Sequence, residues 1–189
     1  MRKAQLVLCM VALLALPMRT AQAADRVRVG ATTTLLNDGF FNNKGVKTWS
    51  PGGDVHVAIP LARWTSLGAG AGYQQVQRTE MFTPSEVQPR NIAFFWLEWS
   101  AYAPLMQDRF ELGGRVSLGR AVAFTSELDG GIGAALHGTA LYWLTPWLGV
   151  TAELGGSLNI FTTTDKSGDG AKPEGLGLVT AKIGAVARF

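Results

Sequence analysis

The chain has 189 residues, with 17 Lys and Arg against 14 Asp and Glu, 23 glycines and 47% apolar residues. This length suits one domain. Beyond the N-terminus, no segment has the 18 or more uncharged apolar residues of a spanning helix, which excludes a helical membrane protein. The small positive excess lies in the N-terminal segment, so a basic nucleic-acid-binding surface is excluded as well.

Residues 1–23 are organised like a secretory signal peptide. Arg2 and Lys3 precede a mostly apolar run over Leu6–Leu16, and Ala21-Gln22-Ala23 is a small-x-small cleavage site. The apolar run is too short to cross a bilayer core of about 30 Å. We therefore expect a leader at 1–23 and export of the remainder.

The expected mature chain, 24–189, is formally neutral. The leader removes Arg2, Lys3 and Arg19 but no acid, so Lys and Arg fall from 17 to 14, which equals the 14 Asp and Glu. Cys9 lies inside the leader's apolar run rather than at the cleavage point, so we expect neither a lipid anchor nor a disulfide in the mature chain.

The mature chain alternates apolar and polar residues with a period of two, which is the signal of strands. Eight such segments follow one another: Arg26–Leu36, Asp54–Leu61, Thr65–Arg78, Asn91–Ala103, Phe110–Val122, Gly131–Leu144, Leu148–Phe161 and Leu176–Phe189. Short connections alternate with longer polar ones, as in membrane barrels with short periplasmic turns. The pattern predicts an all-β fold, an eight-stranded antiparallel up-and-down transmembrane β-barrel, with both termini in the periplasm.

The faces of these strands decide between a membrane barrel and a soluble one. In the segment Leu148–Phe161, one face carries Leu154 and Ile160 and the other carries Thr151 and Glu153. Only 16% of residues are charged, which is low for a soluble exterior. Aromatic residues also stand at strand ends beside the short turns, where a membrane interface would lie. We therefore expect the apolar face to point outward and the barrel to close, since an open edge in lipid leaves backbone groups unpaired.

The sequence resembles the small outer-membrane barrels: the transmembrane domain of outer membrane protein A and the OmpX and OmpW-like groups. The resemblance covers the mature chain and rests on eight alternating strands, tight turns and the terminal Phe189. It implies an outer-membrane location in a Gram-negative bacterium, and it implies that the assembly machinery reads Phe189. The sequence departs from the pattern at Ala187, where such strands often carry an aromatic residue.

Charged side chains on the inward face form a predicted interior network. Its expected members are Glu98, Arg115, Glu153, Lys182, His137, Glu111 and Tyr102. The turn at 104–109 would set Glu98 opposite Arg115 and Tyr102 opposite Glu111, and Glu153 would lie nearly opposite Lys182. Buried charges must be paired, so the network would fill and register the barrel, or alternatively gate a narrow pore for ions and small solutes. Inward glycines at 68, 70, 72 and 113 would make room for Trp96 and Tyr102.

An enzymatic reading is weaker. His137, Thr139 and Glu153 are the one nucleophile, base and orienter set that neighbouring strands could assemble, and it lacks the serine that lipid A deacylases carry two residues after their histidine. His56 is too isolated for a metal site. We expect no catalytic residues, no cofactor and no metal.

On the outward face, Gln75, Gln77 and Arg120 lie near the expected extracellular end, where they would meet lipopolysaccharide head groups. The expected partners are therefore outer-membrane lipids and the assembly machinery, with no nucleic acid, and we expect a monomer. The leading interpretation is a structural or surface-interaction role carried by the longer loops.

Overall fold

The computed structural model describes residues 26–41, 44–47, 52–75, 91–106, 108–124, 130–162 and 173–189. The leader predicted at 1–23 lies outside these residues, and so does the cleavage site. Among the described residues, no helix is long and apolar enough to cross a membrane. All regular structure in this part of the chain is β-strand.

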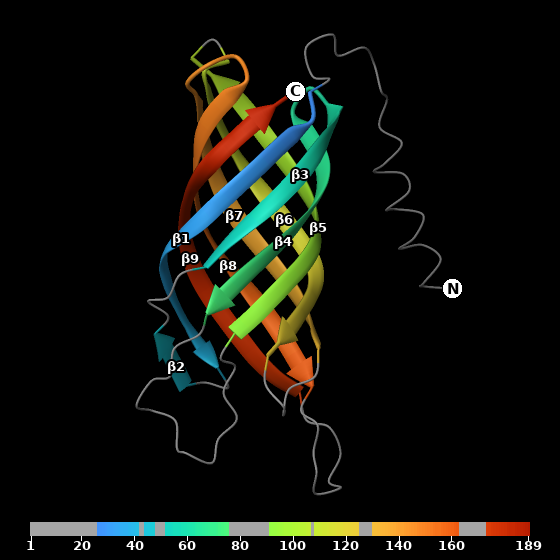
Figure 1. The fold of residues 1–189 in the computed structure, drawn as a ribbon, viewed down its shortest axis with the longest axis vertical. Helices are drawn as coiled ribbons and strands as arrows, with labels where there is room; N and C mark the ends of the chain where they lie inside the picture. Colours follow the sequence, from blue (N-terminus) through green and yellow to red (C-terminus); the bar gives the residue numbers. More distant parts are fainter. Residues whose placement is uncertain are drawn as a thin grey trace, which may run out of the picture.

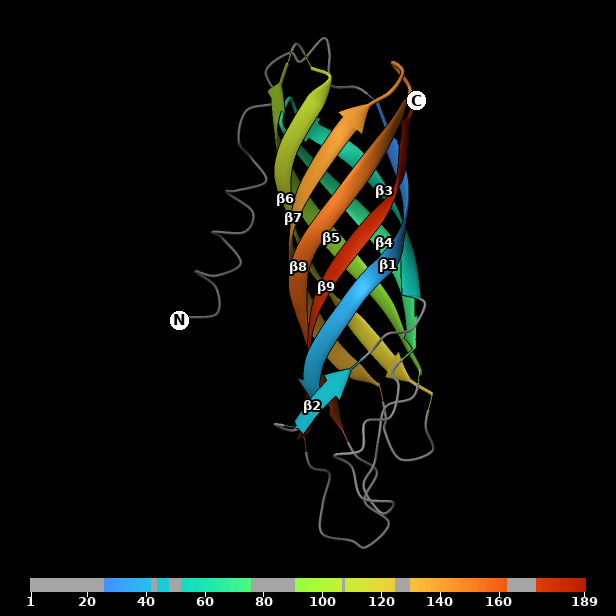
Figure 2. The same cartoon turned by 90° about the vertical axis from the view of Figure 1, so that its left-hand side faces the viewer.

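The strands form one closed antiparallel barrel. They are β1 (Arg28–Phe41), β2 (Lys44–Lys47), β3 (Gly52–Ala62), β4 (Thr65–Gln75), β5 (Asn91–Leu105), β6 (Phe110–Ala123), β7 (Gly131–Trp143), β8 (Leu148–Thr162) and β9 (Pro173–Arg188). Each strand from β3 to β8 pairs with the next, β1 pairs with β3, and β1 also pairs with β9. Figure 2 shows β8, β9 and β1 side by side where the barrel closes. The predicted eight-stranded barrel is confirmed.

The short strand β2 was not predicted. It pairs with the final residues of β1, from Asp38 to Phe41, inside a segment that the sequence analysis took for a polar loop. It forms a hairpin with the end of β1 and is not one of the barrel strands, because β1 pairs with β3 through its earlier residues, Arg28 to Thr33. The barrel proper therefore keeps its eight strands.

The ladder has two irregularities, and a proline explains the first. The pairing of β3 with β4 shifts between Pro60 and Ala62. Proline has no N–H to donate to the ladder, so a bulge is the position where it is tolerated. The pairing of β1 with β9 shifts between Thr34 and Leu36. Beyond this bulge, β1 continues to Phe41, five residues past its predicted end.

Three short turns lie at one end of the barrel together with the C-terminus, at the top of Figure 1. We call this the short-turn end. Arg63 and Trp64 join β3 to β4. At the turn between β7 and β8, Thr145 Oγ1 accepts hydrogen bonds from the backbone N–H of Trp147 and Leu148. The other ends of these strands, among them Gln75, Asn91, Thr162 and Pro173, form the opposite end of the barrel.

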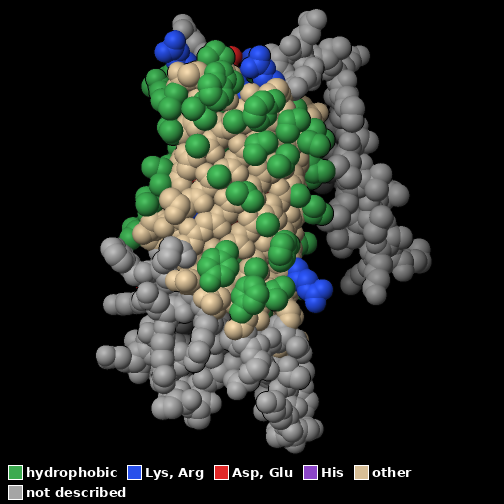
Figure 3. Space-filling model, in the orientation of Figure 1, with side chains coloured by type: hydrophobic (Ala, Val, Ile, Leu, Met, Phe, Trp, Pro, Cys, Tyr) green, Lys and Arg blue, Asp and Glu red, His purple; other side chains and the backbone are tan. Residues whose placement is uncertain are grey.

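Apolar side chains cover the outside of the barrel and polar ones line much of its inside. On β8, Leu154, Leu158 and Ile160 are exposed while Thr151 and Glu153 are buried. Figure 3 shows hydrophobic side chains over the whole visible wall, with Lys and Arg gathered near its ends. The predicted assignment of the two faces is confirmed.

Candidate functional site: the charged interior

Arg115 on β6 lies at the centre of the barrel and is only 2% exposed. Its Nη2 donates to Glu153 Oε2 on β8 at 2.8 Å, and its Nη1 donates to Glu98 Oε2 on β5 at 3.4 Å. The same Nη1 lies 3.2 Å from His56 Nδ1 on β3. One guanidinium therefore links four strands and lies between two buried carboxylates.

The observed pairing of β5 with β6 differs from the predicted register. The sequence analysis set Glu98 opposite Arg115, but Glu98 pairs with Ser117 and Arg115 with Ser100. The two-residue shift arises because β5 runs on to Leu105, so the turn is shorter than predicted. Its residues Met106 and Asp108 have φ of 49° and 64°, which lets the chain reverse tightly. Arg115 reaches Glu98 diagonally.

The same shift moves the residues nearest the short-turn end. Tyr102 was set opposite Glu111, but its ladder partner is Gly113, and Glu111 pairs with Pro104. An ideal Cβ on Gly113 would lie 2.6 Å from the Tyr102 ring, so the glycine makes room for that ring. The expected role of the inward glycines as space for bulky side chains is therefore confirmed at Tyr102.

Trp96 gives Glu98 a second donor. The Trp96 indole Nε1 donates to Glu98 Oε2 at 2.9 Å. The ring lies over Gly70, where an added Cβ would come within 2.5 Å of it. Gly72 faces the same ring, at 3.2 Å. The run of glycines in β4 therefore makes room for the indole, as the sequence predicted, and the indole holds one carboxylate in place.

Lys182 and Glu153 are direct ladder partners across β8 and β9, as expected, but the ion pair forms elsewhere. Lys182 Nζ donates to Asp54 Oδ2 on β3 at 2.6 Å. His56 Nδ1 lies 3.7 Å from the other Asp54 oxygen. Sequence reasoning missed Asp54, although it begins the predicted second strand on the inward parity; nothing in sequence spacing indicates a contact between residues 128 positions apart.

A second charged pair lies nearer the short-turn end. Arg28 on β1 donates to both Glu111 oxygens, at 2.8 and 3.3 Å. The Trp143 indole also donates to Glu111, at 2.8 Å. The Arg28 guanidinium lies over the rings of Tyr102 and Trp143, at 4.7 and 5.7 Å from their centroids. Arg28 and Trp143 were absent from the predicted network.

Charged side chains inside the barrel are paired across strands. The ion-paired inward residues of the described strands are Arg28, Arg115 and Lys182, against Asp54, Glu98, Glu111 and Glu153. Each of these ions has a partner of opposite sign within 3.4 Å. Pairing is what makes such burial tolerable, because a lone charge away from water is very costly. We call this set the charged belt.

Beyond the belt, toward the opposite end, the interior becomes apolar. Ile92, Phe161 and Leu176 are fully buried there. They pack with Ala121, Ala123 and Leu178. We call these six residues the apolar cluster. A cavity of about 80 Å³ separates it from the belt and is lined by Asp54, Arg115, Lys182, Ser117, Asn159 and Leu178 among others. Parity places Phe161 inward, but the sequence analysis did not recognise the cluster.

His137, Thr139 and Glu153 all point inward, yet no hydrogen bond joins them into a relay. His137 Nε2 lies 3.2 Å from Thr180 Oγ1, and Glu153 is held by Arg115. Thr139 faces Glu153 across the ladder, but its hydroxyl has no hydrogen-bond partner among the described residues. This geometry provides no activated nucleophile. The described residues also contain no group of three or more His, Cys, Asp or Glu placed to hold a metal ion.

The outward candidates are placed as follows. Arg120 is exposed on β6, and Gln75 ends β4 at the same end of the barrel. Gln77 lies outside the described residues. Phe189 follows β9 at the short-turn end, is 73% exposed, and donates its backbone N–H to Val27 O at 3.0 Å.

No protein-family model matches the sequence, and no curated protein matches it. Solved structures of similar fold include Neisserial surface protein A, with a TM-score of 0.53 and 14% identity over 87% of this chain and 96% of that one. Another is outer membrane protein AlkL, with a TM-score of 0.56 and 10% identity over 92% and 94% of the two chains. A third is OprG from Pseudomonas aeruginosa, with a TM-score of 0.51 and 13% identity over 92% and 99%. At these identities the likeness is one of fold.

Proposed function

Because the chain has the fold of the small eight-stranded outer-membrane β-barrels, we propose that it is an integral outer-membrane protein of a Gram-negative bacterium. The barrel is a non-conducting scaffold, and a structural or surface-interaction role belongs to the longer connections at the opposite end. The observation that supports insertion is the apolar outer wall around a polar interior. In water, that wall would be an exposed apolar surface far larger than soluble monomers show. In a bilayer it is the surface that lipid requires.

The interior supports the non-conducting reading. A continuous pore would have to pass both the charged belt and the apolar cluster, and Ile92, Phe161 and Leu176 have no exposed surface. Ions avoid a dry apolar constriction, because they would lose their hydration without replacement. The belt is then a means of filling and registering the barrel rather than a valve.

The proposal of membrane insertion is tested by heat modifiability. A folded barrel from the outer-membrane fraction migrates differently on a detergent gel before and after boiling. A single band at one position, or recovery of the chain in the soluble fraction, would contradict insertion. For orientation, an epitope inserted between 163 and 172 is expected to be labelled on intact cells. The same epitope at the Arg63 turn is expected to need outer-membrane permeabilisation.

A gated pore is the second candidate, and the cavity between belt and cluster is the observation that favours it. Planar-bilayer recording separates the two readings. We expect neither the unmodified barrel nor Glu153→Ala to show stepwise currents, once heat modifiability has shown that the variant is folded. Currents that appear only in Glu153→Ala would establish the ion-pair gate and overturn our proposal.

A lipid-modifying activity is tested directly by mass spectrometry of lipid A from cells with and without the protein. Unchanged masses are expected, because His137 is hydrogen-bonded to Thr180 and no relay reaches it. A mass difference that corresponds to a lost or gained acyl chain would show that the barrel is an enzyme.

A further inference from the structure

The outward face of β6 is apolar along its length except at one position. Leu112, Val116 and Leu118 are exposed in succession from the short-turn end, and Arg120 continues the row. A charge on the lipid face is costly at the bilayer midplane, by about 2–4 kcal/mol, but nearly neutral at the interface. The position of Arg120 along the barrel axis therefore decides what it can do.

The height of Arg120 follows from its place in the strand. It lies ten residues along β6 from Phe110, whose ladder partner Tyr142 is exposed near the short-turn end. Ten residues at roughly 3.4 Å each, tilted by roughly 40°, rise about 26 Å along the axis. The apolar band of an outer-membrane barrel is about 25 Å tall. Arg120 is thus one membrane thickness from the aromatic girdle at the short-turn end, at the level of the lipid head groups on the other side.

The surroundings of Arg120 leave its guanidinium available. Among the residues that the structure describes, no carboxylate or carbonyl is paired with it, unlike Arg28 and Arg115 in the interior. Its Nε and Nη2 would lie 3.1 Å from a Cβ at Gly130, so that glycine leaves room for the group. The cation is therefore in position, and no partner for it is found among the described residues.

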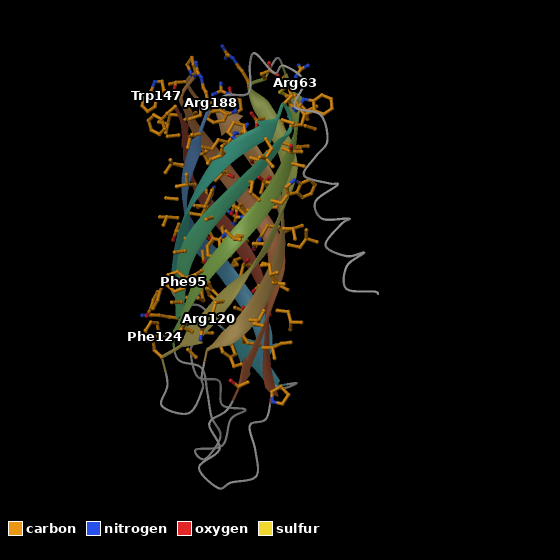
Figure 4. The ribbon with its side chains drawn as sticks, turned by 90° about the vertical axis from the view of Figure 1, so that its right-hand side faces the viewer. Arg63, Phe95, Arg120, Phe124, Trp147 and Arg188 are labelled. Atoms are coloured by element: carbon orange, nitrogen blue, oxygen red, sulfur yellow. The ribbon has the colours of Figure 1, made fainter. Side chains whose placement is uncertain are left out.

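Two exposed aromatic side chains flank this cation. Phe95 is the direct ladder partner of Arg120 and is 55% exposed. Phe124 follows on the same face of β6 and is 58% exposed. Figure 4 shows Phe95, Arg120 and Phe124 together on one side of the barrel, far from Arg63, Trp147 and Arg188 at the short-turn end. The three residues combine a bidentate donor, unpaired among the described residues, with apolar surface at the membrane boundary.

We propose that Arg120 binds a phosphate group of a phosphorylated glycolipid in the outer leaflet, of the lipid A type, while Phe95 and Phe124 contact the apolar part of the same molecule. A guanidinium donates two parallel hydrogen bonds to phosphate, and such charge-assisted bonds are about twice as strong as neutral ones. The site rests on the proposed orientation, which places the opposite end in the outer leaflet. The short-turn end has its own exposed arginines, among them Arg63, but these would face the inner leaflet.

The test is native mass spectrometry of the detergent-purified barrel, titrated with lipid A that carries both phosphates and with dephosphorylated lipid A. We expect Arg120→Gln to lower affinity for phosphorylated lipid A about tenfold or more, and Arg120→Lys to lose less. The matched control Arg63→Gln removes the same charge at the other end and is expected to bind like the unmodified chain. Dephosphorylated lipid A is expected to bind weakly to every variant.

Three results would overturn the inference: unchanged affinity in Arg120→Gln, an equal loss in Arg63→Gln, or equal binding of dephosphorylated lipid A. Inorganic phosphate at millimolar concentration is expected not to displace the lipid, because it offers nothing to Phe95 and Phe124. Complete displacement would assign the site to free phosphate instead. All variants are first checked for heat modifiability. A folded, membrane-inserted barrel that does not bind lipid A would refute this site and leave the proposed function unaffected.

Discussion

Replacing Arg115 with methionine tests whether the charged belt stabilises the barrel. Methionine keeps much of the apolar stem of the side chain and removes the cation. In the native barrel this cation lies 2.8 Å from Glu153 and 3.4 Å from Glu98, with 2% of the residue exposed. The variant would leave two buried carboxylates without their main partner. Lys182, which faces Glu153, could compensate only by leaving its 2.6 Å contact with Asp54.

We expect a large loss of stability because Glu98 and Glu153 would stay buried without a counter-charge. Removing one member of a buried ion pair typically costs about 3–5 kcal/mol, whereas replacing a whole pair with uncharged groups is often close to neutral. We therefore expect Arg115→Met to lower the free energy of unfolding by about 3–5 kcal/mol. The triple variant Glu98→Gln, Arg115→Met, Glu153→Gln should recover most of that loss, because no uncompensated charge remains.

The measurement is urea unfolding of the barrel in phospholipid vesicles, followed by tryptophan fluorescence. Arg63→Met, in an exposed turn, is the matched control and should change stability by no more than about 0.5 kcal/mol. A loss under about 1 kcal/mol in Arg115→Met would show that water or rearrangement compensates the carboxylates. A triple variant less stable than the single one would show that the belt stabilises as a unit, against the argument made from its charges.

Three further predictions test other parts of the fold, the first two by the same assay. Gly70→Ala should cost about 1–3 kcal/mol, because its Cβ would meet the Trp96 ring at 2.5 Å, while Gly138→Ala, whose Cβ would meet its nearest atom at 3.7 Å, should be nearly neutral; equal effects would contradict the packing argument. Val116→Arg places a charge on the outward face of β6, between Phe110 and Arg120 and nearer the middle of the wall, where the valine is 49% exposed, and should cost about 2–4 kcal/mol in vesicles; no loss would argue that this face does not meet lipid. Deleting Phe189 should lower the heat-modifiable fraction in cells without changing refolding in detergent, and an unchanged fraction would show that the assembly machinery does not need that residue.

The faces of the strands could be predicted because they depend on a local property. Successive side chains of a strand point to opposite sides, so the neighbours Glu153 and Leu154 must lie on opposite faces of the wall. The same parity placed Arg115 inside and Arg120 outside. Closure also followed from the sequence, since lipid does not tolerate an open sheet edge. These conclusions needed no knowledge of which strand residues face one another.

The pairing of interior charges could not be predicted, because it depends on register and on the barrel's cross-section. A turn two residues shorter than assumed moved Arg115 from opposite Glu98 to opposite Ser100. Asp54 and Lys182 lie on strands separated by β1, and they meet only because side chains cross the narrow interior. Parity predicts which residues of each strand face inward, but it does not predict which of those residues are close enough to form an ion pair.

The division of the interior into a belt and an apolar cluster changes what an ion-pair switch could achieve. If Arg115 released Glu153, the belt would loosen, but Phe161 and Leu176 would still fill the barrel on the far side of the cavity. Those apolar residues have no charge for a switch to act upon. An ion crossing the belt would therefore reach a cavity of about 80 Å³ and then the apolar cluster, which offers it no polar partner. Under the proposed function, contacts with partners then fall to the connections between strands and to the lipid-facing rim, where Arg120 is the exposed cation among the described outward-facing strand residues.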